Sequence, residues 1–322
     1  MGSDRPQTTA GVVQPIADAA AQRVVSDDEV AREEWRAGLS RAGVLAREGD
    51  HETAREALSD AAKSIVRAFG TDSLEYAETL VARVRFDATT ACTLPDATDE
   101  HLRRADLLAQ AAAIQEARGA GPKLRLDSLR MLSTCLSRAG RRDEGEAVLR
   151  NRLLLAELAL GPAHIDTGFA ALDLARMVSS DGEAAPRARD EEAVALMERA
   201  VAIAKGSLHS SDDTRRAKFL YYMATDDRYA LLLRLEREVE AVEESLAAVR
   251  LELGDFEEEP MPPGPIFRCR NLAVALARMG RSADSLPLLA RAVMEMSRSS
   301  ERSWDKLDED RELLKRLEAG GN

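Results

Sequence analysis

Apolar residues recur every three or four positions in segment after segment of this 322-residue chain, a pattern that predicts amphipathic helices. The clearest example runs from Leu129 to Gly168. Leucines at helical spacing mark a first helix that ends at Gly140, and a second leucine-lined helix closes at Gly161-Pro162. Because one such pair cannot bury its apolar stripe alone, it needs similar pairs beside it.

Similar pairs recur along the chain. Gly49, Gly140 and Gly280 stand at the turn within a pair, separated by multiples of roughly 46 residues. A second set of glycines follows the returning helices: Gly70, Gly119, Gly161, Gly206 and Gly254. We expect all of these glycines to take the left-handed conformation that ends a helix without steric cost. The pattern predicts an all-α fold of about six antiparallel helix pairs.

The breaks between pairs give the domain organisation. We expect a disordered lead-in at residues 1–26, a repeat array at 27–300, and a capping helix with a tail at 301–322. Breaks within the array are expected near residues 70, 120, 162, 207 and 258. The last contains the run EEEPMPPGP at 257–265, whose prolines exclude a helix. We interpret it as an exposed linker, with a docking segment for a proline-reading module as the alternative.

The pairs share a frame of small and large residues. A small residue is followed by a large apolar residue, a glycine turn, a second small residue and a second large apolar residue. The frame occurs as Ser133, Leu136, Gly140, Gly145 and Leu149, and again as Ala273, Leu276, Gly280, Ser285 and Leu289. It resembles the tetratricopeptide motif. The linker GPAHIDTG at 161–168 resembles the Gly-x-x-His-x-x-Thr linker of the longer repeat subclass found in kinesin light chains.

The resemblance implies a right-handed superhelical solenoid, in which the outgoing helices line a concave groove that binds segments of partner proteins. It implies no enzymatic activity. We therefore expect a non-catalytic protein–protein interaction scaffold or adaptor. The alternative is a regulatory sensor that binds a small peptide or ligand and changes the shape of the superhelix.

Charge and composition narrow the class of partner. The formal charge of −12 disfavours a nucleic-acid partner, and no apolar run is long enough to span a membrane. The first 25 residues lack the pattern of a secretory signal, so we expect a cytoplasmic protein. The excess of arginine over lysine, with abundant alanine, suggests a bacterial GC-rich genome. The sequence does not define the oligomeric state.

Candidate catalytic and metal-binding residues are few. Cys92, Cys135 and Cys269 are odd in number and far apart, which disfavours a disulfide framework and a structural zinc site. We expect them to be buried thiols. The four histidines stand at unrelated positions, and no phosphate loop or nucleophile elbow occurs. We therefore predict no catalytic site, metal or cofactor.

Five polar residues of the outgoing helices face the groove when placed on the frame: Arg130, Thr134, Arg176, Arg270 and Asn271. Arginine with asparagine can hold a carboxylate through forked hydrogen bonds, which favours a protein or peptide partner with an acidic segment. The alternative is that these arginines are solvated and paired with the abundant acidic residues of the chain itself.

One long outgoing helix carries four of the twelve aromatic residues: Phe219, Tyr221, Tyr222 and Tyr229. Tyrosine is enriched at the centres of protein interfaces. We therefore add Tyr221 and Tyr222 to the candidate partner-binding residues, and expect at least one of the four aromatic residues to be exposed. The alternative is that the aromatic residues pack in the core.

Overall fold

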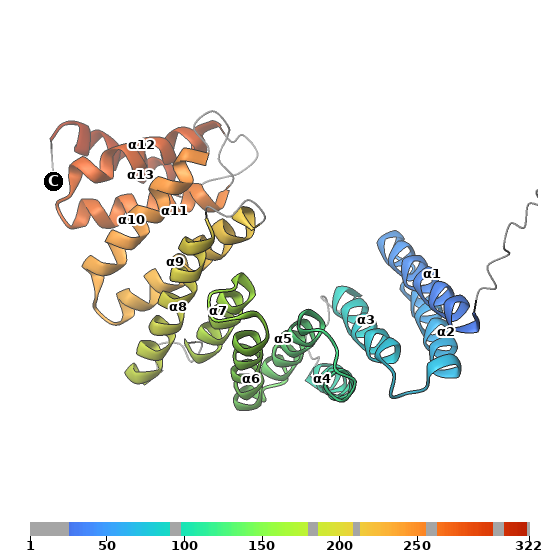
Figure 1. Cartoon of the computed structure of the whole chain (residues 1–322). Coiled ribbons are helices and arrows are strands. Elements are labelled where there is room, and N and C mark those ends of the chain that lie inside the picture. The colour runs from blue at the N-terminus through green and yellow to red at the C-terminus, as the bar shows by residue number, and fades with distance from the viewer. Residues whose placement is uncertain are drawn as a thin grey trace, which may run out of the picture. The chain divides into compact units, whose positions relative to one another are not determined.

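The structure, a computed structural model, describes residues 26–90, 98–179, 186–208, 213–255, 263–298 and 306–320. All regular structure in these ranges is α-helical, in thirteen helices (Figure 1). The all-α prediction is therefore confirmed. The lead-in, Cys92, His209, residues 257–262 of the EEEPMPPGP run and Trp304 lie outside the described residues. The expectation that this run excludes a helix is wrong for residues 263–265, which form the first turn of the helix Pro263–Arg278, where proline is tolerated. The chain divides into two compact units, Met1–Phe86 and Asp87–Asn322.

The first unit contains α1 (Asp27–Glu48), α2 (His51–Phe69) and most of α3 (Leu74–Thr90). Ser26 begins α1, and its side chain accepts a hydrogen bond from the Glu29 amide, which satisfies one of the free donors at the helix start. Among the described residues, two small clusters contribute to the core, beside buried residues of α3 such as Leu80 and Val84. They contain Trp35, Ala61 and Ile65, and Ala42, Ala54, Leu58 and Phe86.

The second unit contains the remaining helices, most of which pack on the next one along the chain. They are α4 (Thr98–Ala117), α5 (Pro122–Arg138), α6 (Arg142–Leu160), α7 (Ile165–Ser179), α8 (Arg187–Ser207), α9 (Thr214–Arg234), α10 (Glu238–Asp255), α11 (Pro263–Arg278), α12 (Ser282–Arg298) and α13 (Leu307–Glu318). One core cluster runs through α5 to α10, and a second through α10 to α13. Helix α13 buries Leu317 in the second cluster.

Tight turns join the helices of three hairpins in the second unit. Gly140 and Gly280 have φ of 79° and 72°, and Glu236 takes the same place between α9 and α10 with φ of 61°. The glycine prediction is wrong at Gly206 and Gly254. These two lie inside α8 and α10 and have no positive φ, because each helix continues past them.

The small residues of the frame bring paired helices into close contact. A Cβ atom on Gly145 would lie 3.1 Å from the carbonyl oxygen of Ser133. In the hairpin of α11 and α12, the Ser285 hydroxyl donates a 2.7 Å hydrogen bond to the carbonyl of Ala273. Ser133 and Ala273 are therefore equivalent positions, and so are Arg130 and Arg270, each three residues earlier.

Candidate functional site

A pocket of about 300 Å³ lies between α5 and α7, with α6 beneath it. It brings together three of the predicted partner-binding residues, Arg130, Thr134 and Arg176. The other lining residues are Ser133, Ser137, Leu149, Asp173 and Met177. Because α5 and α7 are consecutive outgoing helices, the frame placed these three side chains on a common surface from sequence alone.

Two of the three charged groups of this pocket are paired within the fold. Asp173 accepts a 2.8 Å hydrogen bond from Arg152, which is buried behind the pocket. Burial lowers the pKa of Arg152, and Asp173 opposes that shift. Arg176 donates a 2.5 Å hydrogen bond to Asp227 of α9. The alternative interpretation, arginines paired with acids of the same chain, therefore describes Arg176.

Arg130 differs from its neighbours in the pocket. Its side chain is exposed, and no acidic side chain among the described residues pairs with it. Its backbone carbonyl accepts a 3.0 Å hydrogen bond from the Thr134 hydroxyl. The pocket therefore offers one unengaged guanidinium beside hydroxyl groups.

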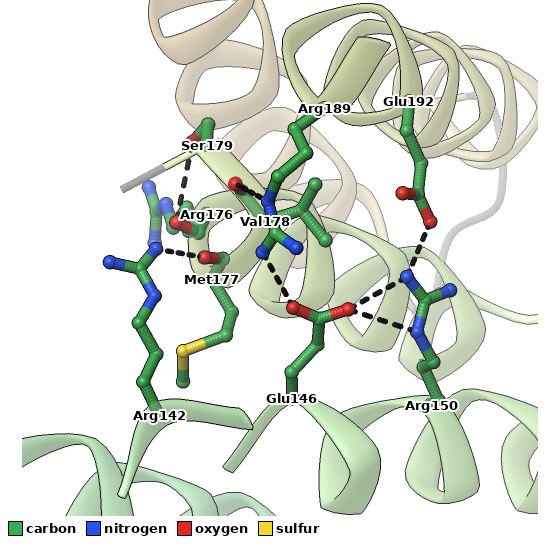
Figure 2. Close-up of polar contacts among 9 residues, drawn as sticks. All are labelled: Arg142, Glu146, Arg150, Arg176, Met177, Val178, Ser179, Arg189 and Glu192. Carbon is green, nitrogen blue, oxygen red and sulfur yellow. Dashed lines mark hydrogen bonds and ion pairs between the residues drawn. The ribbon is translucent and has the colours of Figure 1, made fainter. Parts of the chain in front are cut away.

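The C-terminal end of α7 is held by arginines from two other helices (Figure 2). Arg142 of α6 donates to the carbonyl of Met177, and Arg189 of α8 donates to the carbonyl of Val178 at 3.3 Å. Carbonyls at a helix end have no partner within the helix, so these basic side chains satisfy them. The contacts fix the end of α7, where Arg176 and Met177 line the pocket.

Glu146 links one of these arginines, Arg189, to Arg150 of α6 (Figure 2). Its carboxylate accepts hydrogen bonds from Arg189 at 2.6 Å and from Arg150 at 2.8 Å, and Arg150 also bonds Glu192 at 2.7 Å. Burial raises the pKa of Glu146, but the two arginines outweigh burial and hold this pKa below its ordinary value. Sequence reasoning missed this network, because Glu146 and Arg189 are 43 residues apart and Arg150 and Glu192 are 42 apart.

Arg270 and Asn271 lie away from this pocket. Arg270 donates a 2.6 Å hydrogen bond to Asp310 of α13, and their side chains are 16% and 3% exposed. Helix α13 therefore engages Arg270, and the alternative interpretation describes this residue too. Asn271 is exposed and accepts a 3.1 Å hydrogen bond from Arg270.

The two tyrosines have different environments. Tyr221 is only 2% exposed, so it is not an exposed interface residue. Phe219 of the same helix is 57% exposed, which confirms that at least one of the four aromatic residues is exposed. Small residues one turn away on the same face of α9, Ala217 and Ala224, leave room for its ring in the core. Tyr222 is half-buried, and the guanidinium of Arg268 lies 5.4 Å from its ring centre.

A second pocket, of about 210 Å³, lies between α9 and α11, with α10 beneath it. It contains Asn271 but none of the other predicted residues. Its remaining lining residues are Asp226, Tyr229, Ser245, Gly264, Phe267, Arg268 and Leu272.

No protein-family model and no curated protein matches the sequence. Solved structures do match. BtubC (BKLC) from P. vanneervenii superposes with a TM-score of 0.56 at 12% identity, over 84% of this chain and 94% of that chain. TPR-like repeats of kinesin light chain type from Podosopora anserina superpose with a TM-score of 0.53 at 19% identity, over 71% of this chain and 99% of that chain.

The chain has the fold of a tetratricopeptide-like helical solenoid. The predicted fold and its likeness to kinesin-light-chain-type repeats are confirmed. At sequence identities of 12% and 19%, this structural similarity is evidence for the fold alone. Among the described residues, no group of three histidine, cysteine or acidic side chains is placed to hold a metal ion. No described helix is long and apolar enough to cross a membrane.

Proposed function

We propose that this protein is a non-catalytic scaffold or adaptor that binds an acidic segment of a partner protein along its outgoing helices. The supporting observation is the pocket between α5 and α7, in which Arg130 is exposed without an acidic partner among the described residues. The tetratricopeptide-like fold favours an interaction role in general, because stacked hairpins present extended binding surfaces.

A carboxylate pairs with Arg270, the arginine equivalent to Arg130, which supports a carboxylate as the partner of Arg130. Arg270 stands at the same place in its hairpin as Arg130 and is matched by the carboxylate of Asp310. Arg130 has no such carboxylate among the described residues, so a partner's aspartate or glutamate would supply the missing one. Hydrogen bonds between a guanidinium and a carboxylate are roughly twice as strong as neutral ones.

The rest of the pocket suits an acidic side chain. Its volume of about 300 Å³ is at the small end of ligand pockets, so it would hold one side chain of a longer segment. The hydroxyls of Thr134 and Ser137 can donate to a carboxylate. Arg176 remains a nearby positive charge although Asp227 engages it.

The wider setting is also a proposal. We infer that the hairpins belong to one repeat array, that α13 closes its end, and that outgoing helices line a concave groove. The described cysteines, Cys135 and Cys269, are buried thiols that form no disulfide, which suits a reducing cytoplasm. The arginine-rich composition favours a bacterial source.

Peptide selection tests the proposal. The full chain would be screened against a display library of random peptides of about twelve residues, and the dissociation constants of selected peptides measured by fluorescence anisotropy. We expect enrichment of aspartate and glutamate, and a loss of affinity of about tenfold or more in Arg130→Glu. The matched control is Arg41→Glu, which reverses an exposed arginine on α1. Peptides without acidic residues, or equal affinities for both variants, would overturn the proposal.

A further inference from the structure

The pocket between α9 and α11 has the same position in the fold as the Arg130 pocket, two hairpins further along the chain. Each pocket lies between two consecutive outgoing helices, and the returning helix between them contributes one residue to the base of the pocket. Arg130 and Ser133 line the first pocket, and Asp226 and Tyr229, at the same distances before the turn residues Gly140 and Glu236, line the second. One partner segment running along the outgoing helices would meet both pockets.

The chemistry of the second pocket is different. Its acidic group is Asp226, whose side chain is 42% exposed. One carboxylate oxygen of Asp226 accepts a hydrogen bond from Arg268. Arg268 is itself only 13% exposed, because it also donates to the carbonyl of Tyr222 and lies over the Tyr222 ring. The guanidinium is therefore fixed within the fold, and the carboxylate is its more accessible partner.

Aromatic rings form part of the same wall. Phe267 lines the pocket with a side chain that is 47% exposed, and Tyr229 lines it beside Asp226. The face of an aromatic ring attracts cations. Another ring of this unit already does so, since Arg216 lies 5.5 Å from the ring centre of Phe169.

These features favour a cation over the other classes of ligand. An anion would meet the Asp226 carboxylate and the negative faces of the rings. An apolar group would remove water from Asp226 without replacing its hydrogen bonds, which costs free energy. Burial raises the pKa of Asp226 despite Arg268, and the adjacent Asp227 adds to this shift. The attraction of Arg268 therefore does not fully offset the cost of burying the Asp226 carboxylate, and a second cation would stabilise its charged form.

We propose that the pocket between α9 and α11 binds a basic side chain, lysine or arginine, of the partner segment. The ammonium or guanidinium group would bond the second oxygen of Asp226 and lie against the ring of Phe267. The inference rests on the proposed function for the existence of a partner segment. It adds that this segment carries an acid at one end and a base at the other, which fixes the direction in which it lies on the array.

Amino-acid probes test the pocket without a known partner. Acetyl-arginine amide, acetyl-lysine amide and acetyl-glutamate amide would be titrated into the isotope-labelled full chain and followed by NMR. We expect the two basic probes to shift the resonances of Asn271 and Phe267 with weak affinity, and the acidic probe to leave them unchanged. Asp226→Asn should weaken binding of the basic probes about fivefold or more. The matched control is Asp308→Asn, a fully exposed aspartate of α13. Equal binding of the basic probes to wild type and Asp226→Asn overturns the inference.

The selected peptides separate this inference from the proposed function. When the basic residues of these peptides are replaced with glutamine, the affinity of the wild-type protein for them should fall about tenfold. The affinity of the Asp226→Asn variant should change little. If that replacement is neutral while Arg130→Glu still abolishes binding, the inference fails and the proposed function stands. If no acidic peptide binds but the basic probes bind at Asp226, the proposed function fails and the cation pocket stands.

Discussion

Arg130 and Arg270 occupy the same position in two hairpins of one fold, yet their surroundings are different. Arg270 is largely buried and bonds Asp310 of α13. Arg130 is exposed in a pocket whose acidic residue, Asp173, is engaged by Arg152. The difference arises from the helix that follows each hairpin, and not from the arginine itself. A repeat position therefore defines where a side chain lies, and the next element decides whether that side chain is available.

The sharpest contrast is expected in stability. Arg270→Ala should lower the free energy of unfolding by about 3 kcal/mol, because it leaves the buried carboxylate of Asp310 unpaired. Arg130→Ala should change it by no more than about 0.5 kcal/mol, as for other exposed side chains. Urea unfolding followed by circular dichroism measures both. The double variant Arg270→Ala with Asp310→Ala should recover much of the lost stability, because it leaves no unpaired carboxylate. Similar losses for Arg130→Ala and Arg270→Ala would contradict the difference between the two arginines.

The equivalence of the two hairpins can be tested at their closest contacts. Gly145→Val should cost about 1–3 kcal/mol, because the side chain would press on the carbonyl of Ser133. Gly145→Ser should cost less, since Ser285 makes a hydrogen bond to the equivalent carbonyl of Ala273. Thermal unfolding distinguishes the two variants. Equal melting temperatures for serine and valine at position 145 would show that the two contacts are not equivalent.

The network around Glu146, near the C-terminal end of α7, gives a pH-dependent prediction. The pKa of Glu146 is lower in the folded chain than its ordinary value of 4.5. Its ionised form therefore stabilises the fold above pH 4.5, and this contribution is lost as the pH falls through the lower folded value. Glu146→Gln should cost about 1 kcal/mol at pH 7 and progressively less in acid. The control is Glu144→Gln, which breaks only an exposed pair with Arg141 and should cost little at any pH.

The smallest effect is expected at the turn between α9 and α10, whose hairpin lies between the two compared hairpins along the chain. Glu236 has a positive φ where Gly140 and Gly280 stand in the equivalent turns. Glu236→Gly should raise the free energy of unfolding by about 0.5–1 kcal/mol by relieving this strain. Gly140→Ala should lower it by a similar amount. Melting temperatures measure both changes, and a destabilised Glu236→Gly would show that the turn is not strained.

The fold was predictable because it depends on local patterns. Helical spacing of leucines gave the helices, and the glycine turns with small residues such as Ser133 and Gly145 gave the pairing. The limits of these patterns are visible at Gly206 and Gly254, where the residue type permits a helix end but the helix continues. A glycine allows a positive φ without requiring it.

The site was predictable only in part. The frame brought Arg130, Thr134 and Arg176 to one pocket because equivalent positions of consecutive outgoing helices face each other. It could not show which arginines are paired, since their partners lie 51 residues away for Arg176 and 40 for Arg270. Nor could it show that Tyr221 is buried, because that depends on how closely α9 packs against its neighbours.

The order of packing along the chain affects how the protein folds. The well-packed helix pairs of the second unit are consecutive, apart from α7 with α9, so each hairpin closes a short loop and can form early. During synthesis, the pocket around Arg130 is complete once α7 has docked. Arg270 meets its acid only when residue 310 has been made, so the hairpin of α11 and α12 gains this contact after both of its own helices are complete.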